Sequence, residues 1–331
     1  MLTAADFQPP RLLRNPHLQS VLGSSALRRH RGLRALAASG AQTRELILDG
    51  GNGVRLQGWH SRVPGGGTRG MALLLHGWEG SAESGYMRLT AARLLACGFE
   101  VFRLNFRDHG DTHHLNEDLF HSNRLDEVVH ASADMVARLR VRDLVVAGYS
   151  LGGNHALRLG LRAAVAGLPL RRIAAVCPLV DPATTMVHME QAPQFYDWYF
   201  RRKWRSSLVR KRELFPDRYP YDDATLGLDL RGLMGWLAQR HAGFGTVDAY
   251  FDSYSIAGAR LAALEVPADI LMSRDDPVIP YDDFQQWQLP PRARLEIASW
   301  GGHCAFVENL HGDGFAERWV AARLCSDLQV R

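Results

Sequence analysis

The alternation of apolar and polar stretches along this chain predicts a sheet of mostly parallel strands connected by helices. Four short, mainly apolar segments are predicted to be strands: 71–75, 99–104, 143–149 and 172–177. The first of them is continuously apolar, which is typical of a strand covered on both faces. Three longer segments between them are predicted to be helices: 84–97, 125–140 and 151–166. Strands and helices that alternate in this way form an α/β fold with helices on both faces of the sheet.

The pattern differs at the two ends of the chain. Residues 1–40 contain turn signals such as Asn15-Pro16 and are expected to be irregular. Residues 43–49 and 54–59 are predicted to form a hairpin across the glycine-rich stretch between them. Four further elements are predicted towards the C-terminus: strands 268–273 and 293–298, and helices near 281–288 and 313–326.

The alternation stops between Asp181 and Gly258, in a stretch rich in aromatic residues. We expect this stretch to be mostly helical and to cover the carboxyl ends of the strands, where parallel sheets bind their ligands. Three parts are therefore predicted. They are the first part of the sheet domain with an N-terminal extension, a helical cap insertion, and the rest of the sheet domain: residues 1–180, 181–260 and 261–331.

Length and composition are those of an ordinary folded protein. Of the 331 residues, 46% are hydrophobic and 22% are charged, and the net charge of +4 gives no argument for nucleic-acid binding. The four cysteines are widely spaced and are expected to be reduced thiols: Cys97, Cys177, Cys304 and Cys325. No signal peptide and no membrane-spanning run is visible, so we expect a cytoplasmic protein, with no obligate protein partner.

The stretch Val145–Asn154 carries the clearest chemical signal. It is an apolar strand, a turn of the form G-x-S-x-G and the start of a helix, with Ser150 at the tip of the turn. A serine in such a turn sits on a strained corner above the sheet, and Gly148 and Gly152 lie where a Cβ would collide. The free N–H groups of the following helix favour negative charge there. Ser150 is therefore predicted to be a nucleophile rather than an incidental serine.

A serine hydroxyl needs a base to take its proton, and the base needs an acid to orient it. In proteins with this turn, the acid and then the histidine follow the serine along the chain. Asp275 and Asp276 both follow a predicted strand. We choose Asp276, because the usual acid of this type of fold lies four residues before a proline, here Pro280. His303 follows the next strand and two glycines, and is predicted to be the base.

The oxyanion that develops during attack on a carbonyl needs two backbone donors. We predict that they are the N–H of Leu151, directly after the serine, and the N–H of Trp78, in the loop after the first central strand. His109 and His113 have a spacing that suits two metal ligands on a helix, but Gly110 and the predicted loop weaken this alternative. A loop at the rim of the active site is preferred, and no metal or cofactor is expected.

Two basic clusters have an ordinary and a functional interpretation. Residues 28–34 are interpreted as a solvated face or as a contact with an acidic surface. Residues 200–212 hold seven basic residues, and Phe200, Trp204 and Leu208 repeat every four. The second cluster is interpreted as an amphipathic lid helix with a solvated basic face. Alternatively, it rests on an anionic membrane or binds an acidic group of the substrate.

The chain resembles an α/β-hydrolase of the YheT-like group, related to the abhydrolase-domain lipases of animals and to the medium-chain ester synthases and esterases of yeast. The resemblance covers nearly the whole chain and rests on six stretches: Asn15–Ser20, His76–Ser81, Asn105–Arg107, Gly148–Asn154, Asp275–Pro277 and Gly301–His303. The first stretch is specific to this group. Asp108 is a departure, because relatives often have glycine there. The resemblance implies an α/β-hydrolase fold and hydrolysis of carboxylic esters through Ser150, Asp276 and His303.

The expected function is that of a serine esterase in lipid metabolism, acting on short- to medium-chain acyl esters through an acyl-enzyme. The aromatic insertion indicates an apolar acyl pocket. Three alternatives stay open: an acyltransferase in which an alcohol intercepts the acyl-enzyme, cleavage of an amide or thioester, and a binding module without turnover.

Overall fold

The framework of the computed structural model, which describes residues 2–66 and 69–326, is one eight-stranded sheet. Its strands are β1 (Gln42–Asp49), β2 (Arg55–Arg62), β3 (Met71–Leu75), β4 (Glu100–Leu104), β5 (Leu144–Tyr149), β6 (Leu170–Val176), β7 (Ala268–Ser273) and β8 (Ala293–Ala298). Their order across the sheet is β1-β2-β4-β3-β5-β6-β7-β8. β2 pairs antiparallel with β1 and β4, and the other neighbours are parallel. The predicted α/β class is confirmed.

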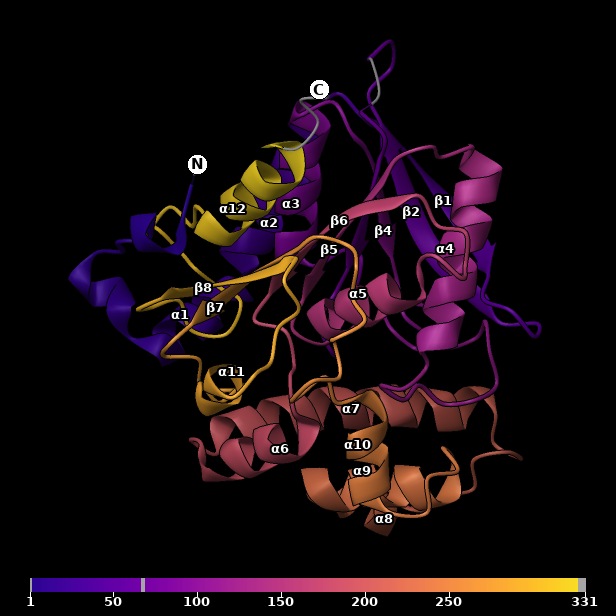
Figure 1. Cartoon of the computed structure of the whole chain (residues 1–331). Helices are drawn as coiled ribbons and strands as arrows, with labels where there is room; N and C mark the ends of the chain where they lie inside the picture. Colours follow the sequence, from indigo (N-terminus) through magenta and orange to yellow (C-terminus); the bar gives the residue numbers. More distant parts are fainter. Residues whose placement is uncertain (1, 67–68, 327–331) are drawn as a thin grey trace.

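Helices cover both faces of this sheet. They are α1 (Pro16–Gly23), α2 (Ala26–Ala38), α3 (Gly85–Ala96), α4 (Leu125–Leu139), α5 (Leu151–Arg162), α6 (Pro182–Gln191), α7 (Phe195–Leu214), α8 (Asp223–Gly227), α9 (Leu230–Arg240), α10 (Val247–Tyr254), α11 (Asp282–Gln285) and α12 (Phe315–Cys325). Figure 1 shows α2, α3 and α12 on one side of the sheet and α4 and α5 on the other. α6–α10 form a separate layer near the ends of the strands (Figure 1). None of the helices in the described part of the chain is both long and apolar enough to cross a bilayer.

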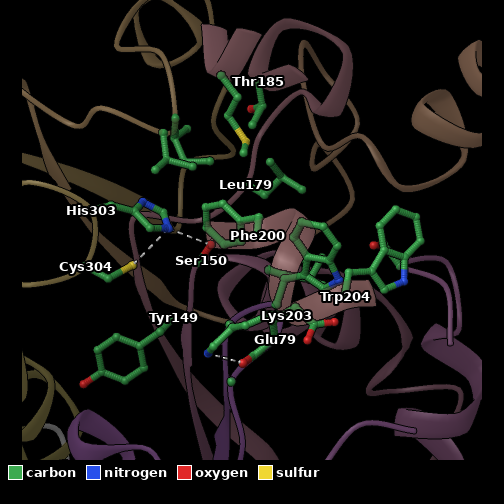
Figure 2. A pocket seen from close by; sticks show the side chains of 18 of the residues that line it. Glu79, Tyr149, Ser150, Leu179, Thr185, Phe200, Lys203, Trp204, His303 and Cys304 are labelled. Atoms are coloured by element: carbon green, nitrogen blue, oxygen red, sulfur yellow. Dashed lines mark hydrogen bonds between the residues drawn. The ribbon is translucent and has the colours of Figure 1, made fainter. Parts of the chain in front are cut away.

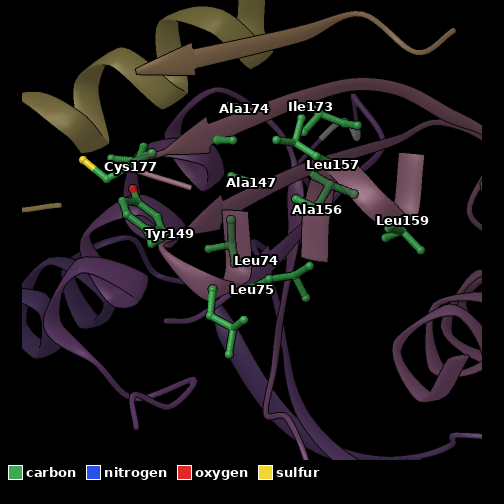
Figure 3. Close-up of a cluster of buried hydrophobic side chains, with 14 of the residues drawn as sticks. Leu74, Leu75, Ala147, Tyr149, Ala156, Leu157, Leu159, Ile173, Ala174 and Cys177 are labelled. Carbon is green, nitrogen blue, oxygen red and sulfur yellow. The ribbon is translucent and has the colours of Figure 1, made fainter. Parts of the chain in front are cut away.

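The core lies where α5 packs on the central strands. All residues of β3 and β5 are buried, as the continuous apolar runs predict. In Figure 3, Leu157 of α5 lies beside Ile173 of β6, close to Ala147 of β5. Burying one such leucine or isoleucine side chain contributes about 1.5–3 kcal/mol. This packing fixes the first turn of α5, which follows Ser150, against the carboxyl ends of the central strands.

The N-terminal segment is helical, so the expectation of an irregular segment over residues 1–40 is wrong. α1 begins at Pro16 because the side chain of Asn15 accepts the N–H groups of His17 and Leu18. A proline in the first position completes this helix start, since its missing N–H has no intrahelical partner to lose. α2 begins in the same way, with the Ser25 hydroxyl as its cap. The Asn-Pro pair is thus a helix start and not only a turn signal.

The first basic cluster is not simply a solvated face. Arg28 of α2 is buried and forms an ion pair with Glu317 of α12, which is buried too. α2 also lies very close to α3, since a Cβ on Gly32 would come within 2.8 Å of the carbonyl oxygen of Gly85. A buried arginine is tolerated because its partner carboxylate compensates the charge. Arg28 therefore anchors α2 to α12, whereas Arg29, His30 and Arg34 of the cluster are exposed.

The segment predicted as an insertion contains α6–α10, which lie between β6 and β7 in the chain. Within α7, Trp204 and Leu208 are buried, as the apolar stripe predicts. Lys211, on the same helix, is buried as well, so the interpretation of a solvated basic face is wrong at this position. Its ammonium group donates to Asp108 Oδ1 at 2.7 Å, which gives that unusual aspartate a structural role.

Two predicted helices are shorter in the structure. The helix predicted over 151–166 ends at Arg162, and the chain then turns through Gly167, whose φ of +63° suits glycine. The helix predicted near 281–288 is the single turn α11.

Candidate active site

Ser150 lies on a sharp turn between β5 and α5. Its φ is 54° and its ψ is −121°, a left-handed conformation that a serine adopts only under constraint. The two glycines provide the room. A Cβ on Gly148 would lie 2.1 Å from the carbonyl oxygen of Gly152, and one on Gly152 would lie 2.3 Å from that of Leu75. The strained turn presents the serine hydroxyl at the edge of the sheet.

His303 joins this hydroxyl to an acid. Its Nε2 lies 2.9 Å from Ser150 Oγ, and its Nδ1 lies 2.9 Å from Asp276 Oδ2 (Figure 2 shows the serine contact). Since an ionised aspartate only accepts hydrogen bonds, Nδ1 carries the proton in the neutral ring and Nε2 is free to accept from the serine. The three predicted residues thus lie in the arrangement required for removal of the serine proton.

The two neighbouring aspartates have different partners. Asp276 Oδ1 accepts the N–H groups of Val278 and Ile279 at 2.8 Å and 3.0 Å, which fixes the carboxylate towards His303. Asp275 Oδ1 instead accepts the N–H of Gly302 at 3.0 Å. Burial raises the pKa of Asp275 to about 6. The geometry therefore favours Asp276 as the acid, with Asp275 bracing the loop that carries the histidine.

The charge state of His303 is controlled by its neighbours. Burial alone would lower the pKa of the imidazole, but the Asp276 carboxylate and the Cys304 thiol outweigh it, and the pKa stands well above its usual value. Burial also opposes ionisation of Cys304. The thiol of Cys177 and the imidazole of His303 outweigh that effect and lower the pKa of Cys304 to about 6. Cys304 Sγ lies 3.9 Å from His303 Nε2, so this cysteine belongs to the site.

The loop after β3 contains Trp78 and is held by His76. Nε2 of His76 accepts the N–H of Phe106 at 3.2 Å, and Nδ1 donates to the carbonyl of Gly77 at 2.7 Å. Burial holds the pKa of His76 well below its usual value, so the ring is neutral and keeps this pattern. Trp78 and Leu151 both line the cavity beside Ser150. Because Leu151 is the first residue of α5, its N–H precedes the intrahelical hydrogen bonds.

Helix α7 contacts this loop directly. Lys203 of α7 donates to the carbonyl oxygen of Glu79 at 2.8 Å (Figure 2). The Phe200 ring stacks on Trp78 with a centroid distance of 5.4 Å. Glu79 has a φ of 55°, and burial raises the pKa of its side chain to about 7. The conformation of the loop beside the serine is therefore coupled to the position of α7.

A cavity of about 250 Å³ surrounds Ser150 and His303. Part of its wall is apolar and comes from α6, α9, α10 and the segment after β6: Leu179, Met186, Met189, Met234, Leu237 and Phe251. Another part is polar and comes from the start of α2, the Trp78 loop, α3 and α7: Ser24, Arg29, Glu79, Ser84, Tyr86 and Lys203. The cavity thus has both apolar and polar lining around the reacting groups.

His109, His113 and His114 do not line this cavity, contrary to the preferred interpretation of that loop. His109 and His113 are buried, and His113 Nε2 lies 2.8 Å from the hydroxyl of Ser207. The lining residues come from a later part of the same connection, at 120–122. Within the described ranges, no group of three or more histidine, cysteine, aspartate or glutamate side chains is arranged to hold a metal ion.

Sequence analysis missed four residues at or behind the site: Ser20, Glu79, Lys203 and Cys304. Ser20 was part of the stretch Asn15–Ser20 on which the resemblance rests, and Glu79 adjoined the predicted oxyanion donor, so both had a weak signal. Lys203 was one of seven basic residues in a helix, with no mark to separate it from the rest.

Comparisons with known proteins place the fold in a known group. Residues 72–318 match the family described as "Alpha/beta hydrolase family". An esterase of Pyrobaculum calidifontis has 17% identity and a TM-score of 0.57, over 97% of this chain and 98% of that protein. An esterase of Pyrococcus furiosus has 17% identity and a TM-score of 0.55, over 87% of this chain and 90% of that protein. A serine hydrolase of the bacterium Cycloclasticus zankles has 14% identity and a TM-score of 0.58, over 86% of this chain and 98% of that protein. No curated protein sequence matches this chain significantly.

Proposed function

This chain belongs to the alpha/beta hydrolase family, and on that basis we propose that it hydrolyses carboxylic esters through Ser150, His303 and Asp276. The observation that carries the proposal is the continuous hydrogen-bond chain from Ser150 Oγ through both ring nitrogens of His303 to Asp276. The esterases with similar folds support the same choice of substrate class.

In the proposed reaction, His303 Nε2 takes the proton of Ser150 while Oγ attacks the ester carbonyl carbon. The N–H groups of Leu151 and Trp78 stabilise the oxyanion, and one such donor is typically worth about 3 kcal/mol in the transition state. His303 then gives its proton to the leaving alcohol, and an acyl-enzyme remains on Ser150. Water, deprotonated by His303, attacks the acyl carbon, and the proton returns to Ser150 Oγ as the acid leaves.

The apolar and polar parts of the cavity lining suggest where the acyl chain and the alcohol of the ester bind. We assign the acyl chain to the apolar region, because methionine and leucine side chains there bury a hydrocarbon without unpaired polar groups. A cavity of about 250 Å³ suits a short- to medium-chain acyl group better than a long one. The alcohol then faces the polar region.

The proposal also covers the cellular location of the protein, the role of residues 181–260 and a contact with the membrane. We propose that it works in the cytoplasm in lipid metabolism and that residues 181–260 act as a cap over the cavity. A peripheral contact with an anionic membrane has support from α7, where Trp198 is 53% exposed and its ring lies 5.3 Å from the Arg202 guanidinium.

A series of p-nitrophenyl esters from acetate to palmitate tests the proposal, with the Ser150→Ala variant as the control. We expect activity that peaks at short or medium chains and is lost in the variant. A peak at palmitate would overturn the chain-length assignment, and equal turnover by the variant would overturn the role of Ser150. Repeating the assay with ethanol present distinguishes hydrolysis, which gives mainly acid, from acyl transfer, which gives mainly ethyl ester.

A further inference from the structure

Helix α1 is hydrogen bonded to the loop that carries His303. The Ser20 hydroxyl oxygen accepts the backbone N–H of His303 at 2.9 Å. The same hydroxyl donates to the carbonyl oxygen of Pro16, one turn earlier in α1, at 2.8 Å. Because its proton is committed to Pro16, the hydroxyl presents a lone pair to His303 in a fixed direction.

A second contact ties α1 to the far end of the same loop. Gln19 is fully buried, and its side-chain oxygen accepts the N–H of Val307 at 2.7 Å. Its amide nitrogen donates to the carbonyl of Val307 at 3.0 Å and to that of Leu13 at 2.7 Å. The glutamine thus binds the backbone of Val307 in both directions, and a buried amide satisfied in this way is costly to displace.

The helix and the loop are also in close steric contact. A Cβ on Gly302 would lie 2.5 Å from the carbonyl oxygen of Pro16 and 2.7 Å from Ser20 Oγ. A Cβ on Gly23 would lie 2.8 Å from the Cβ of Ala305. These two glycines allow α1 to lie directly against the residues on both sides of His303.

The loop needs such support because its backbone is strained. Gly302, Cys304 and Phe306 have φ values of 55°, 58° and 43°, and two of these residues are not glycine. Left-handed conformations of this kind persist only where the surroundings hold them. Asp276 and Ser150 hold the ring of His303, whereas Ser20 holds its backbone.

We propose that Ser20 and Gln19 are positioning residues that place His303 for proton transfer between Ser150 and the substrate. The proposal rests on the proposed function, in which His303 is the base. It gives the group-specific stretch Asn15–Ser20 a role: Asn15 starts the helix, and the residues at its end hold the catalytic loop. A displacement of the ring by even 1 Å is expected to be costly in rate.

The test compares Ser20→Ala with Ser20→Thr, which keeps the hydroxyl. Ser39→Ala is the matched control, because the Ser39 hydroxyl also donates to a carbonyl of its own helix, that of Leu36, but far from His303. We expect Ser20→Ala to lower kcat on p-nitrophenyl butyrate about tenfold with KM changed less than about twofold. Ser20→Thr is expected to restore most of kcat, and Ser39→Ala to keep wild-type values.

A second measurement separates positioning from general support of the fold. The rate of fluorophosphonate labelling is measured for Ser20→Ala in the wild-type and His303→Ala backgrounds. If Ser20 acts through His303, Ser20→Ala slows labelling about tenfold in the wild-type background and has no further effect in the His303→Ala background. Equal slowing in both backgrounds, or an unchanged kcat in Ser20→Ala, would overturn the proposal. Absence of any Ser150-dependent turnover in the wild type would instead overturn the proposed function and, with it, this inference.

Discussion

The Lys211 ammonium group of α7 lies 2.7 Å from Asp108 Oδ1, and both side chains are buried. The lysine also donates to the backbone carbonyls of His113 and Asn116. The contact therefore joins α7 to the connection after β4 in a buried place. It also explains why aspartate stands at position 108, since a glycine there would leave the buried lysine without its counter-charge.

We predict that Lys211→Met destabilises the protein by about 3–5 kcal/mol, because it leaves the Asp108 carboxylate buried without its partner charge. Urea unfolding measures the change in the free energy of unfolding. Arg210→Gln is the matched control: Arg210 pairs with Asp111 at 2.7 Å as well, but at the surface, and should cost no more than about 1 kcal/mol. A similar decrease in the free energy of unfolding in both variants would show that the Asp108–Lys211 pair stabilises the protein no more than a surface pair does.

The pKa of His303 sets the pH dependence of the proposed reaction. The imidazole must be neutral to accept the serine proton, and its pKa is held well above the usual value, chiefly by the Asp276 carboxylate against the effect of burial. Activity should therefore rise with pH and level off only above the ordinary pKa of histidine, which is about 6.5.

Asp276→Asn removes the charge that favours the protonated ring, so the acid limb of the kcat/KM profile should move to lower pH. The same change should lower kcat by about 10⁴-fold, because the tautomer is no longer fixed. Asp275→Asn is the control, since Asp275 contacts Gly302 and not the His303 ring. An acid limb that stays in place in Asp276→Asn would contradict the assignment of the pair.

Lys203 is predicted to act on the rate more than on binding. Its hydrogen bond to the Glu79 carbonyl holds the residue next to Trp78, whose N–H we propose as an oxyanion donor. Lys203→Met should lower kcat about tenfold on p-nitrophenyl butyrate, with a smaller change in KM. Arg202→Met, one residue earlier, removes a cation that stacks on Trp198 and should leave kcat near the wild-type value. Equal effects of the two substitutions would contradict the proposed link.

The central part of the fold and the candidate reacting residues could be identified from the sequence because their signals are local. Continuous apolar runs mark β3 and β5, and the turn around Ser150 contains its own steric requirements in two glycines. The order of serine, acid and histidine along the chain then follows from the order of the strands. These features depend on few contacts between distant residues.

The missed features depend on contacts between residues far apart in sequence. Arg28 and Lys211 look like surface cations until Glu317 and Asp108 are brought to them by the fold. In the same way, Ser20 gains its partner only when α1 packs against the loop of His303, 283 residues later. α1 was missed because its cap, Asn15, was interpreted only as part of a turn signal, and α2 was missed because its cap, Ser25, was not recognised as a helix start.

The most direct test of the account is mass spectrometry after treatment with a fluorophosphonate probe, on the wild type and on Ser150→Ala. We predict one adduct, on Ser150, and no adduct in the variant, because a serine activated by His303 reacts far faster than an ordinary surface serine. Circular dichroism of both proteins checks that they are folded. A folded wild type that forms no adduct, or an adduct that persists in the variant, would contradict the claim that Ser150 is the activated nucleophile.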